Sequence, residues 1–185
     1  MNMEPAGVYG GTVPVPRIAV AVMALAVGCG SPSAPEPVPG SPGWREAQVL
    51  SVEEAVYRFQ FGDYRSGLQP ASLTYCLARN TAAELLPWTD PPEALLRRFA
   101  GHQPPVKKVS LCRMDLQNLN GVMDVETGGP AVVFRLAPPA WESDTEVVVD
   151  GGHHVNGLNG SGKTYRVRFQ GGAWVVVEAR WRWIS

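Results

Sequence analysis

The sequence lacks an apolar run long enough to cross a membrane as a helix. Its most hydrophobic stretch, residues 18–28, has only eleven residues, whereas a helix needs roughly 18–20 residues to span the hydrocarbon core. That length is typical of the hydrophobic region of an export signal peptide. We therefore interpret residues 1–29 as a signal peptide that precedes the folded part of the chain.

The sequence also lacks an excess of charge of either sign. It has 16 Lys and Arg against 17 Asp and Glu, a formal net charge of −1 at pH 7. The basic pairs at 97–98 and 107–108 do not extend into a basic stripe. Binding to nucleic acid requires clustered positive side chains that neutralise phosphates. We therefore expect no nucleic-acid partner.

The motifs of common catalytic and metal sites are missing as well. There is no GxSxG or CxxC motif, and no cysteine has a histidine within a recognisable motif. His153 and His154 are adjacent, and in a strand they would point to opposite faces. A zinc site needs three or four convergent ligands. We therefore predict no catalytic residue, metal site or cofactor.

One motif does match a nucleotide-binding pattern, but its context is wrong. Residues 157–164, GLNGSGKT, fit the phosphate-binding pattern GxxxxGK[ST]. That site works only when a helix follows the glycine loop and presents its N-terminus to the phosphates. Here the strand-like residues 165–169 follow, and 21 residues remain after Thr164. We therefore predict a hairpin turn in this region and no nucleotide binding.

Three cysteines are present. The first, Cys29, follows the small and apolar residues 26–28, and this arrangement resembles the lipobox of bacterial lipoproteins. Ala26 departs from the leucine that the family prefers at that position. The resemblance implies that Cys29 is lipidated and anchors the protein to a bacterial membrane, with the folded domain in the cell envelope outside the cytoplasm. The alternative is an ordinary secretory signal in which Cys29 is incidental.

The other two cysteines, Cys76 and Cys112, then form an even number in an oxidising compartment. Both lie in strand-like segments, and they would form a disulfide if those two strands are neighbours. Two free buried thiols are the alternative. We predict the disulfide.

The five prolines of residues 30–43 exclude a regular helix or strand there. Such a segment acts as a semi-extended spacer with about 3 Å per residue, which is a reach of roughly 40 Å. We interpret residues 30–43 as a flexible, disordered tether. Residues 44–185 then form a single domain, because their number is close to the usual length of one domain.

The domain sequence predicts an α+β fold. Ser51 and Asp90 stand at helix N-cap positions ahead of apolar stripes, which predicts two short helices ending near Gly62 and Gly101. Period-two alternation and turn residues then predict an antiparallel sheet. We expect both helices on one face of a curved antiparallel sheet of about five to six strands. The expected strands are 71–79, 106–114, 131–137, 145–149, 165–169 and 173–184, and residues 153–158 are a further candidate.

The C-terminal part, with its GGAWVVV turn, resembles the curved sheets of NTF2-like and cystatin-like domains. In our interpretation Trp181 and Trp183 share one face of the last strand, beside Tyr165 of the preceding strand. Packing in the core is one explanation of this aromatic face. A small-molecule pocket lined by these three residues is the other. We therefore expect an envelope lipoprotein with a binding or structural domain, and the alternative is an NTF2-like ligand carrier or small enzyme.

Overall fold

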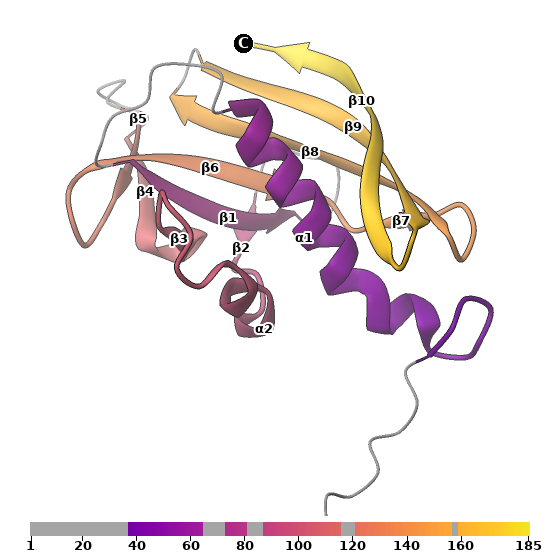
Figure 1. Cartoon of the computed structure of the whole chain (residues 1–185). Coiled ribbons are helices and arrows are strands. Elements are labelled where there is room, and N and C mark those ends of the chain that lie inside the picture. Colours follow the sequence, from indigo (N-terminus) through magenta and orange to yellow (C-terminus); the bar gives the residue numbers. More distant parts are fainter. Residues whose placement is uncertain (1–36, 65–72, 81–86, 116–120, 157–158) are drawn as a thin grey trace, which may run out of the picture. The chain divides into compact units, whose positions relative to one another are not determined.

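The computed structural model describes residues 37–64, 73–80, 87–115, 121–156 and 159–185. Cys29, the predicted signal peptide and the first part of the predicted tether lie outside these residues. Within them, a long helix, a short helix and two 3₁₀ turns accompany one sheet (Figure 1). The helical elements are α1 (Trp44–Tyr64), α2 (Glu93–Leu96), η1 (Arg97–Phe99) and η2 (Val109–Leu111).

The described residues form a ten-stranded sheet whose main path has the order β10-β9-β8-β6-β1-β2. Four short strands lie off this path: β3 beside β1, β5 beside β6, β4 beside β5, and β7 beside β8. The strands are β1 (Thr74–Asn80), β2 (Trp88–Thr89), β3 (Val106–Lys108), β4 (Cys112–Asp115), β5 (Gly121–Asp124), β6 (Pro130–Leu136), β7 (Ala140–Trp141), β8 (Glu146–Asn156), β9 (Asn159–Gln170) and β10 (Ala173–Ile184).

The α+β prediction is confirmed, but the sheet is mixed and has more strands than the five to six expected. Strand β1 runs parallel to both β3 and β6, and the other pairs are antiparallel. The number of strands is larger than expected because two short strands can pair with the same edge of one longer strand. One edge of β1, for example, pairs first with β3 and then with β2. Strands of two or three residues are too short to show the alternating pattern that predicts a strand from the sequence.

Helix α1 begins at Trp44, well before the predicted start at Ser51. The reason is tertiary contact: the Trp44 indole donates a hydrogen bond to the carbonyl of Asp144 (2.7 Å) and packs edge-on against Phe169. Ser51 therefore lies inside the helix, where its hydroxyl accepts a hydrogen bond from Arg98. The predicted N-cap at Ser51 is wrong.

Helix α1 lies across one face of the sheet (Figure 1). Its buried stripe includes Val52, Val56 and Phe61. Buried Tyr57 donates a hydrogen bond from its hydroxyl to the carbonyl of Ala78 (2.6 Å), which fixes the helix to β1. Burying this apolar stripe against the sheet stabilises the helix more than its intrinsic propensity does. The sheet residues of this core are Leu73, Tyr75, Leu77, Val132, Phe134, Leu136, Val147, Val149, Tyr165, Val167 and Trp174.

The second predicted helix is confirmed, although it is shorter than expected. It begins after Pro92, and Asp90 does not cap it. The Asp90 carboxylate instead accepts hydrogen bonds from the backbone N–H (2.8 Å) and hydroxyl (2.7 Å) of Ser110. Gly101 follows η1 with a φ of 77°, as expected for a glycine just beyond a helix end.

A second, smaller cluster covers β1 and β6 on the face that points away from α1, which we call the outer face. The predicted strand 106–114 is broken there, because η2 separates β3 from β4. A disulfide joins Cys76 of β1 to Cys112 of β4, whose Cα atoms are 6.5 Å apart. The predicted disulfide is therefore confirmed. The buried members of this cluster are Cys76, Ala78, Val109, Val122, Ala131 and Val133.

The three strands β8, β9 and β10 form a long antiparallel unit (Figure 1). The two strands predicted at 145–149 and 153–158 are one strand, β8. The described part of the nucleotide-like motif, residues 159–164, belongs to β9 and is not a hairpin turn. Gly171 and Gly172, with φ of 59° and 85°, form the predicted turn between β9 and β10, which requires positive φ at both positions.

Candidate functional site

Two bulges in β10 decide which side chains reach each face of the sheet. Val177 and Arg182 have no partner in the register of β9, so the alternation of faces is reset after each of them. Trp181 pairs with Lys163, whereas Trp183 pairs with Gly162, the next residue of β9. Since cross-strand partners share a face, Trp181 and Trp183 lie on opposite faces.

The structure therefore does not bring the predicted pocket residues together. Tyr165 is buried under α1, and its hydroxyl accepts a hydrogen bond from Gln60 (3.2 Å). Burial raises the pKa of Tyr165 to about 12. Trp181 lies on the same face but is 58% exposed, with its ring over the ammonium of Lys163. Trp183 lies on the outer face, so neither Tyr165 nor Trp181 can line a pocket together with it.

Trp183 instead meets Arg135 above a floor of glycine. In the register of the sheet, Arg135 of β6 pairs with Gly152 of β8, Gly152 pairs with Gly162 of β9, and Gly162 pairs with Trp183 of β10. The two glycines leave the outer face free of side chains between the two ends of this row. The Arg135 guanidinium and the Trp183 ring meet over it, 5.6 Å from carbon to ring centroid.

Gly162 is required by this arrangement. A Cβ atom at position 162 would lie 2.2 Å from the Trp183 indole nitrogen, far inside van der Waals contact. Gly152 is confined in a different way, since its Cβ would lie 2.0 Å from the carbonyl oxygen of Ser161. Any side chain at either position would displace the indole or separate β8 from β9.

A small cavity of about 100 Å³ opens beside this row, and we call it the Arg135 cavity. The volume is about three times the roughly 30 Å³ that one water occupies. It is smaller than the roughly 300–1,000 Å³ typical of sites that enclose a whole small molecule. The cavity thus has room for a chemical group and not for a complete ligand. Its lining residues are Arg135, Asp150, Gly151, Gly162, Lys163, Arg182 and Trp183.

The charges around the cavity leave Arg135 without an acceptor. Arg135 is only 4% exposed, and among the described residues its guanidinium forms no hydrogen bond or ion pair. Asp150 is the nearest acid in the lining, but its two oxygens accept from Thr164 (2.6 Å) and Arg182. Lys163 is also engaged, with Asp63 at 2.7 Å. Burial lowers the pKa of Arg135, and the charge of Asp150 opposes that change.

The two adjacent histidines point to opposite faces of β8, as predicted. His153 lies on the α1 face, where its Nδ1 is 3.1 Å from the hydroxyl oxygen of Ser161. His154 lies toward the outer face near Trp88, and burial followed by the charge of Arg135 lowers its pKa. A serine paired with a histidine can act as a nucleophile, but Ser161 is only 4% exposed. A substrate cannot reach this hydroxyl in the observed conformation.

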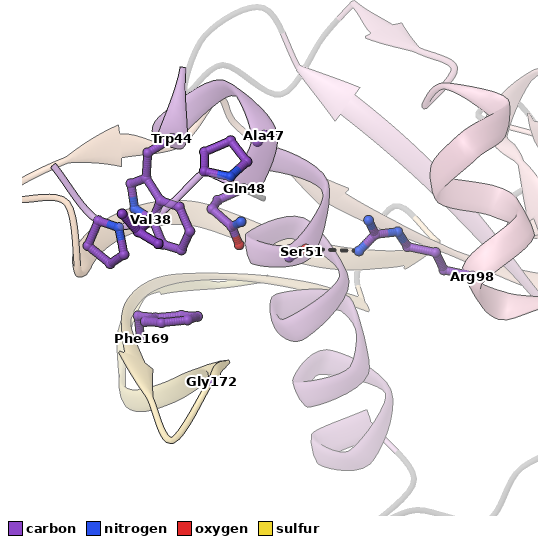
Figure 2. Close-up of a pocket in the computed structure, with 10 residues that line it drawn as sticks. Val38, Trp44, Ala47, Gln48, Ser51, Arg98, Phe169 and Gly172 are labelled. Carbon is purple, nitrogen blue, oxygen red and sulfur yellow. Dashed lines mark hydrogen bonds between the residues drawn. The ribbon is translucent and has the colours of Figure 1, made fainter. Parts of the chain in front are cut away.

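A cavity of about 570 Å³ lies at the start of α1 (Figure 2). Trp44 and Gln48 of α1, Phe169 of β9 and the Gly172 turn surround it, and Val38 of the preceding segment lies against it. Arg98 approaches from the other side and donates to Ser51 (3.1 Å). Gln48 accepts a hydrogen bond from the Trp174 indole and Ser51 accepts one from Arg98, so these polar side chains are used within the fold and do not select a ligand.

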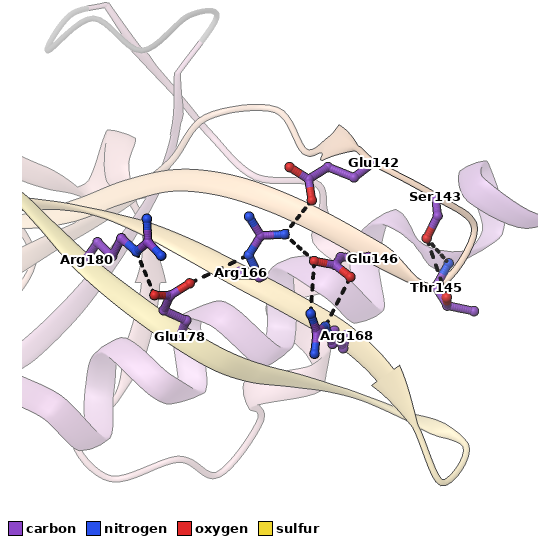
Figure 3. A network of polar contacts seen from close by, with 8 residues as sticks. All are labelled: Glu142, Ser143, Thr145, Glu146, Arg166, Arg168, Glu178 and Arg180. Atoms are coloured by element: carbon purple, nitrogen blue, oxygen red, sulfur yellow. Dashed lines mark hydrogen bonds and ion pairs between the residues drawn. The ribbon is translucent and has the colours of Figure 1, made fainter.

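Farther along the outer face, a network of ion pairs joins β8, β9 and β10 (Figure 3). Arg166 lies at its centre and contacts Glu142, Glu146 and Glu178. Arg168 binds the second oxygen of Glu146 at 3.1 Å. These hydrogen bonds lower the pKa of Glu146. Each charge in the network already has a partner, so we interpret this region as an ordinary solvent-facing surface.

Within the described residues, no three His, Cys, Asp or Glu side chains are grouped so as to hold a metal ion. No helix in the described part of the chain combines the length and apolar character needed to cross a membrane. The chain matches no protein-family model, no curated protein and no solved structure. The Arg135 cavity is therefore the candidate functional site, because it combines a cavity with a buried charge that lacks a partner among the described residues.

Sequence reasoning did not find Arg135. The available signal was the pair of glycine groups at 151–152 and 160–162, which a strand interior disfavours unless a ligand or another chain segment approaches closely. Two of these glycines, Gly160 and Gly162, also lie within the match to the nucleotide-binding motif. In the structure, Gly162 leaves the space that the Trp183 indole fills, and Gly152 allows the close approach of the Ser161 carbonyl oxygen.

Proposed function

We propose that this protein is a bacterial envelope lipoprotein whose single domain serves as a tethered binding module outside the cytoplasm. The observation that carries the proposal is the disulfide between buried Cys76 and half-buried Cys112. Disulfides persist in exported proteins and are rare in the cytosol. The lipobox-like residues ahead of Cys29 supply the expected anchor, and the proline-rich segment after it supplies the tether.

A binding role suits the chemistry of the domain better than catalysis does. The serine–histidine contact between Ser161 and His153 is closed to substrate, because Ser161 is buried. The Arg135 cavity holds a charge that a ligand would neutralise, and the other charged groups of its lining, Asp150, Lys163 and Arg182, are already engaged in ion pairs. The likeness to NTF2-like and cystatin-like domains stays a prediction.

Lipid attachment tests this proposal directly. The full-length chain, expressed in a bacterium supplied with radiolabelled fatty acid, should take up label and fractionate with membranes. The variant Cys29→Ala should lose the label and be released from the membrane fraction, because the thiol is the attachment point. The matched control Ser31→Ala, two residues away, should behave like the wild type. Equal labelling of Cys29→Ala and the wild type would refute the anchor.

A further inference from the structure

We propose that the Arg135 cavity binds a single oxyanion group, a carboxylate or a phosphate, carried by the ligand of this domain. The inference deepens the proposed function, because it rests on the domain being a binding module and names the chemistry that the module recognises. Arg135, Trp183 and the two glycines between them form the site.

The first argument is electrostatic. Arg135 is buried and, among the described residues, lacks an acceptor for its five N–H groups. Buried charges in proteins are normally paired, since an unpaired ion loses its hydration without compensation. Of the other charged groups in the lining, Asp150 and Arg182 satisfy each other, and Lys163 is satisfied by Asp63. The cavity therefore carries one uncompensated positive charge.

The second argument concerns orientation. The Arg135 guanidinium carbon lies 5.6 Å from the centroid of the Trp183 ring, within the range of a cation–π contact, and this contact helps to hold the arginine side chain in place. A planar guanidinium held in place offers two parallel N–H groups, which match the two oxygens of a carboxylate or phosphate. The ring itself is fixed by Gly162, whose missing side chain is the space that the indole fills. The row is thus pre-organised for a forked contact.

The third argument is size. A cavity of about 100 Å³ accepts one oxyanion group and excludes a larger ligand, so the remainder of the ligand would extend over the outer face. The ion-pair network of Arg166 lies on that same face, but its charges are already paired. Specificity for the anionic group would therefore come from the Arg135 cavity and not from the network.

The test is a titration of the full-length chain, with its disulfide intact, with inorganic phosphate and separately with acetate at constant ionic strength. The readout is the ¹H–¹⁵N signals of the Arg135 side chain and the Trp183 indole. We expect saturable shifts of both signals for at least one anion. A stronger response to phosphate identifies a phosphate group, and a stronger response to acetate identifies a carboxylate. Either result supports the proposal, and no saturable shift with either anion overturns it.

Substitutions test whether the anion binds in the Arg135 cavity. Arg135→Gln should weaken binding by about tenfold or more, because it removes the charge and the fork together. Arg168→Gln is the matched control: it removes an outer-face arginine that is already paired with Glu146, and it should leave the affinity within about twofold. If the control lost as much affinity as Arg135→Gln, binding would be a property of the general surface charge, and the proposal would be wrong.

A second pair of variants keeps the test decisive if Arg135→Gln does not fold. Arg135→Lys retains the positive charge but has no planar fork, so affinity should fall several-fold while the fold is kept. Gly162→Ala should displace the Trp183 indole and weaken binding by a similar factor. Unchanged affinity in both variants would refute the site. A lipidated protein that binds neither anion would refute this inference alone, and an unlipidated protein that binds phosphate or acetate would refute the anchor alone.

Discussion

The two halves of the sheet are built differently. Strands β1 and β6 form a parallel pair covered on both faces, by α1 on one side and by the disulfide-linked β4–β5 segment on the other. Strands β8, β9 and β10 are antiparallel, and among the described elements α1 packs on one of their faces while the outer face carries polar side chains. Parallel strands are usually buried on both sides, and antiparallel strands often face water on one.

This difference explains where the candidate site lies. On the doubly covered half, most side chains of β1 and β6 are buried, and both strands are mainly apolar in sequence. On the singly covered half, the outer face is free to carry charge, glycine and aromatic residues in a particular arrangement. Arg135 lies where the two halves meet, since β6 pairs with β1 on one side and with β8 on the other.

The largest expected contrast in stability is between a core residue of the covered half and an exposed residue of the open half. Phe134 of β6 is fully buried and its ring packs on Phe61 and Tyr75. Phe134→Ala should lower the free energy of unfolding by about 3–5 kcal/mol, from lost burial and the cavity it leaves. Val177→Ala, at a bulge and 40% exposed, should change it by less than about 0.5 kcal/mol. Urea denaturation of both variants measures the two free energies of unfolding. Similar losses of stability in both variants would contradict the difference between the two halves.

Removing the disulfide should weaken the covered half selectively. The double variant Cys76→Ala/Cys112→Ala should lose about 2–5 kcal/mol, because the bridge closes a loop across a sequence separation of 36. Hydrogen exchange should show the loss of protection first in the β4–β5 segment and last in β9. If exchange increased equally in all strands, the disulfide would not stabilise the β4–β5 segment in particular.

The smallest of these effects is a pH dependence that also belongs to the covered half. Burial by itself raises the pKa of Asp124 in β5, but hydrogen bonds from Lys107, the Glu126 N–H, Thr74 and Thr127 outweigh burial and lower it to about 2. A pKa lower in the folded state than in the unfolded state means stabilisation that is present above about pH 4. That stabilisation is lost as the pH falls through about 2.

The size of this contribution is about 2 kcal/mol, given about 1.4 kcal/mol per unit of pKa. Asp124→Asn should therefore be about 2 kcal/mol less stable than the wild type at pH 7, and the difference should shrink between pH 4 and pH 2. Urea denaturation across that range measures it. Glu178→Gln, in the exposed ion-pair network, is the matched control and should show less than about 1 kcal/mol at any pH. A constant difference for Asp124→Asn would contradict the assigned pKa.

The local elements were predictable where the sequence signal was local. The turn at Gly171–Gly172, the extent of β10 and the helix near Glu93 followed from turn glycines, period-two alternation and proline placement. The early start of α1 was not predictable, because it depends on the contact of Trp44 with Asp144, a hundred residues away. The parallel pairing of β1 with β6 depends likewise on partners distant in sequence.

The candidate site was not predictable for a related reason. The aromatic residues of β10 were visible, but their faces depend on bulges at Val177 and Arg182 that arise from the fit of β10 to β9. One extra residue on one strand moves every later side chain to the other face. The sequence around Arg135 did not indicate a site. An isolated arginine in an apolar strand looks the same in the sequence whether or not its guanidinium has an ion-pair partner in the fold.

The sequence by itself determined the α+β class, the turn between the last two strands and the identity of the two cysteines available for a disulfide. Those properties depend on local backbone preference and on which side chains are present. Only the tertiary structure decided which strands are neighbours, that Trp181 and Trp183 face opposite ways, and that Arg135 meets Trp183 over Gly152 and Gly162. These depend on register, which forms only when distant segments pair.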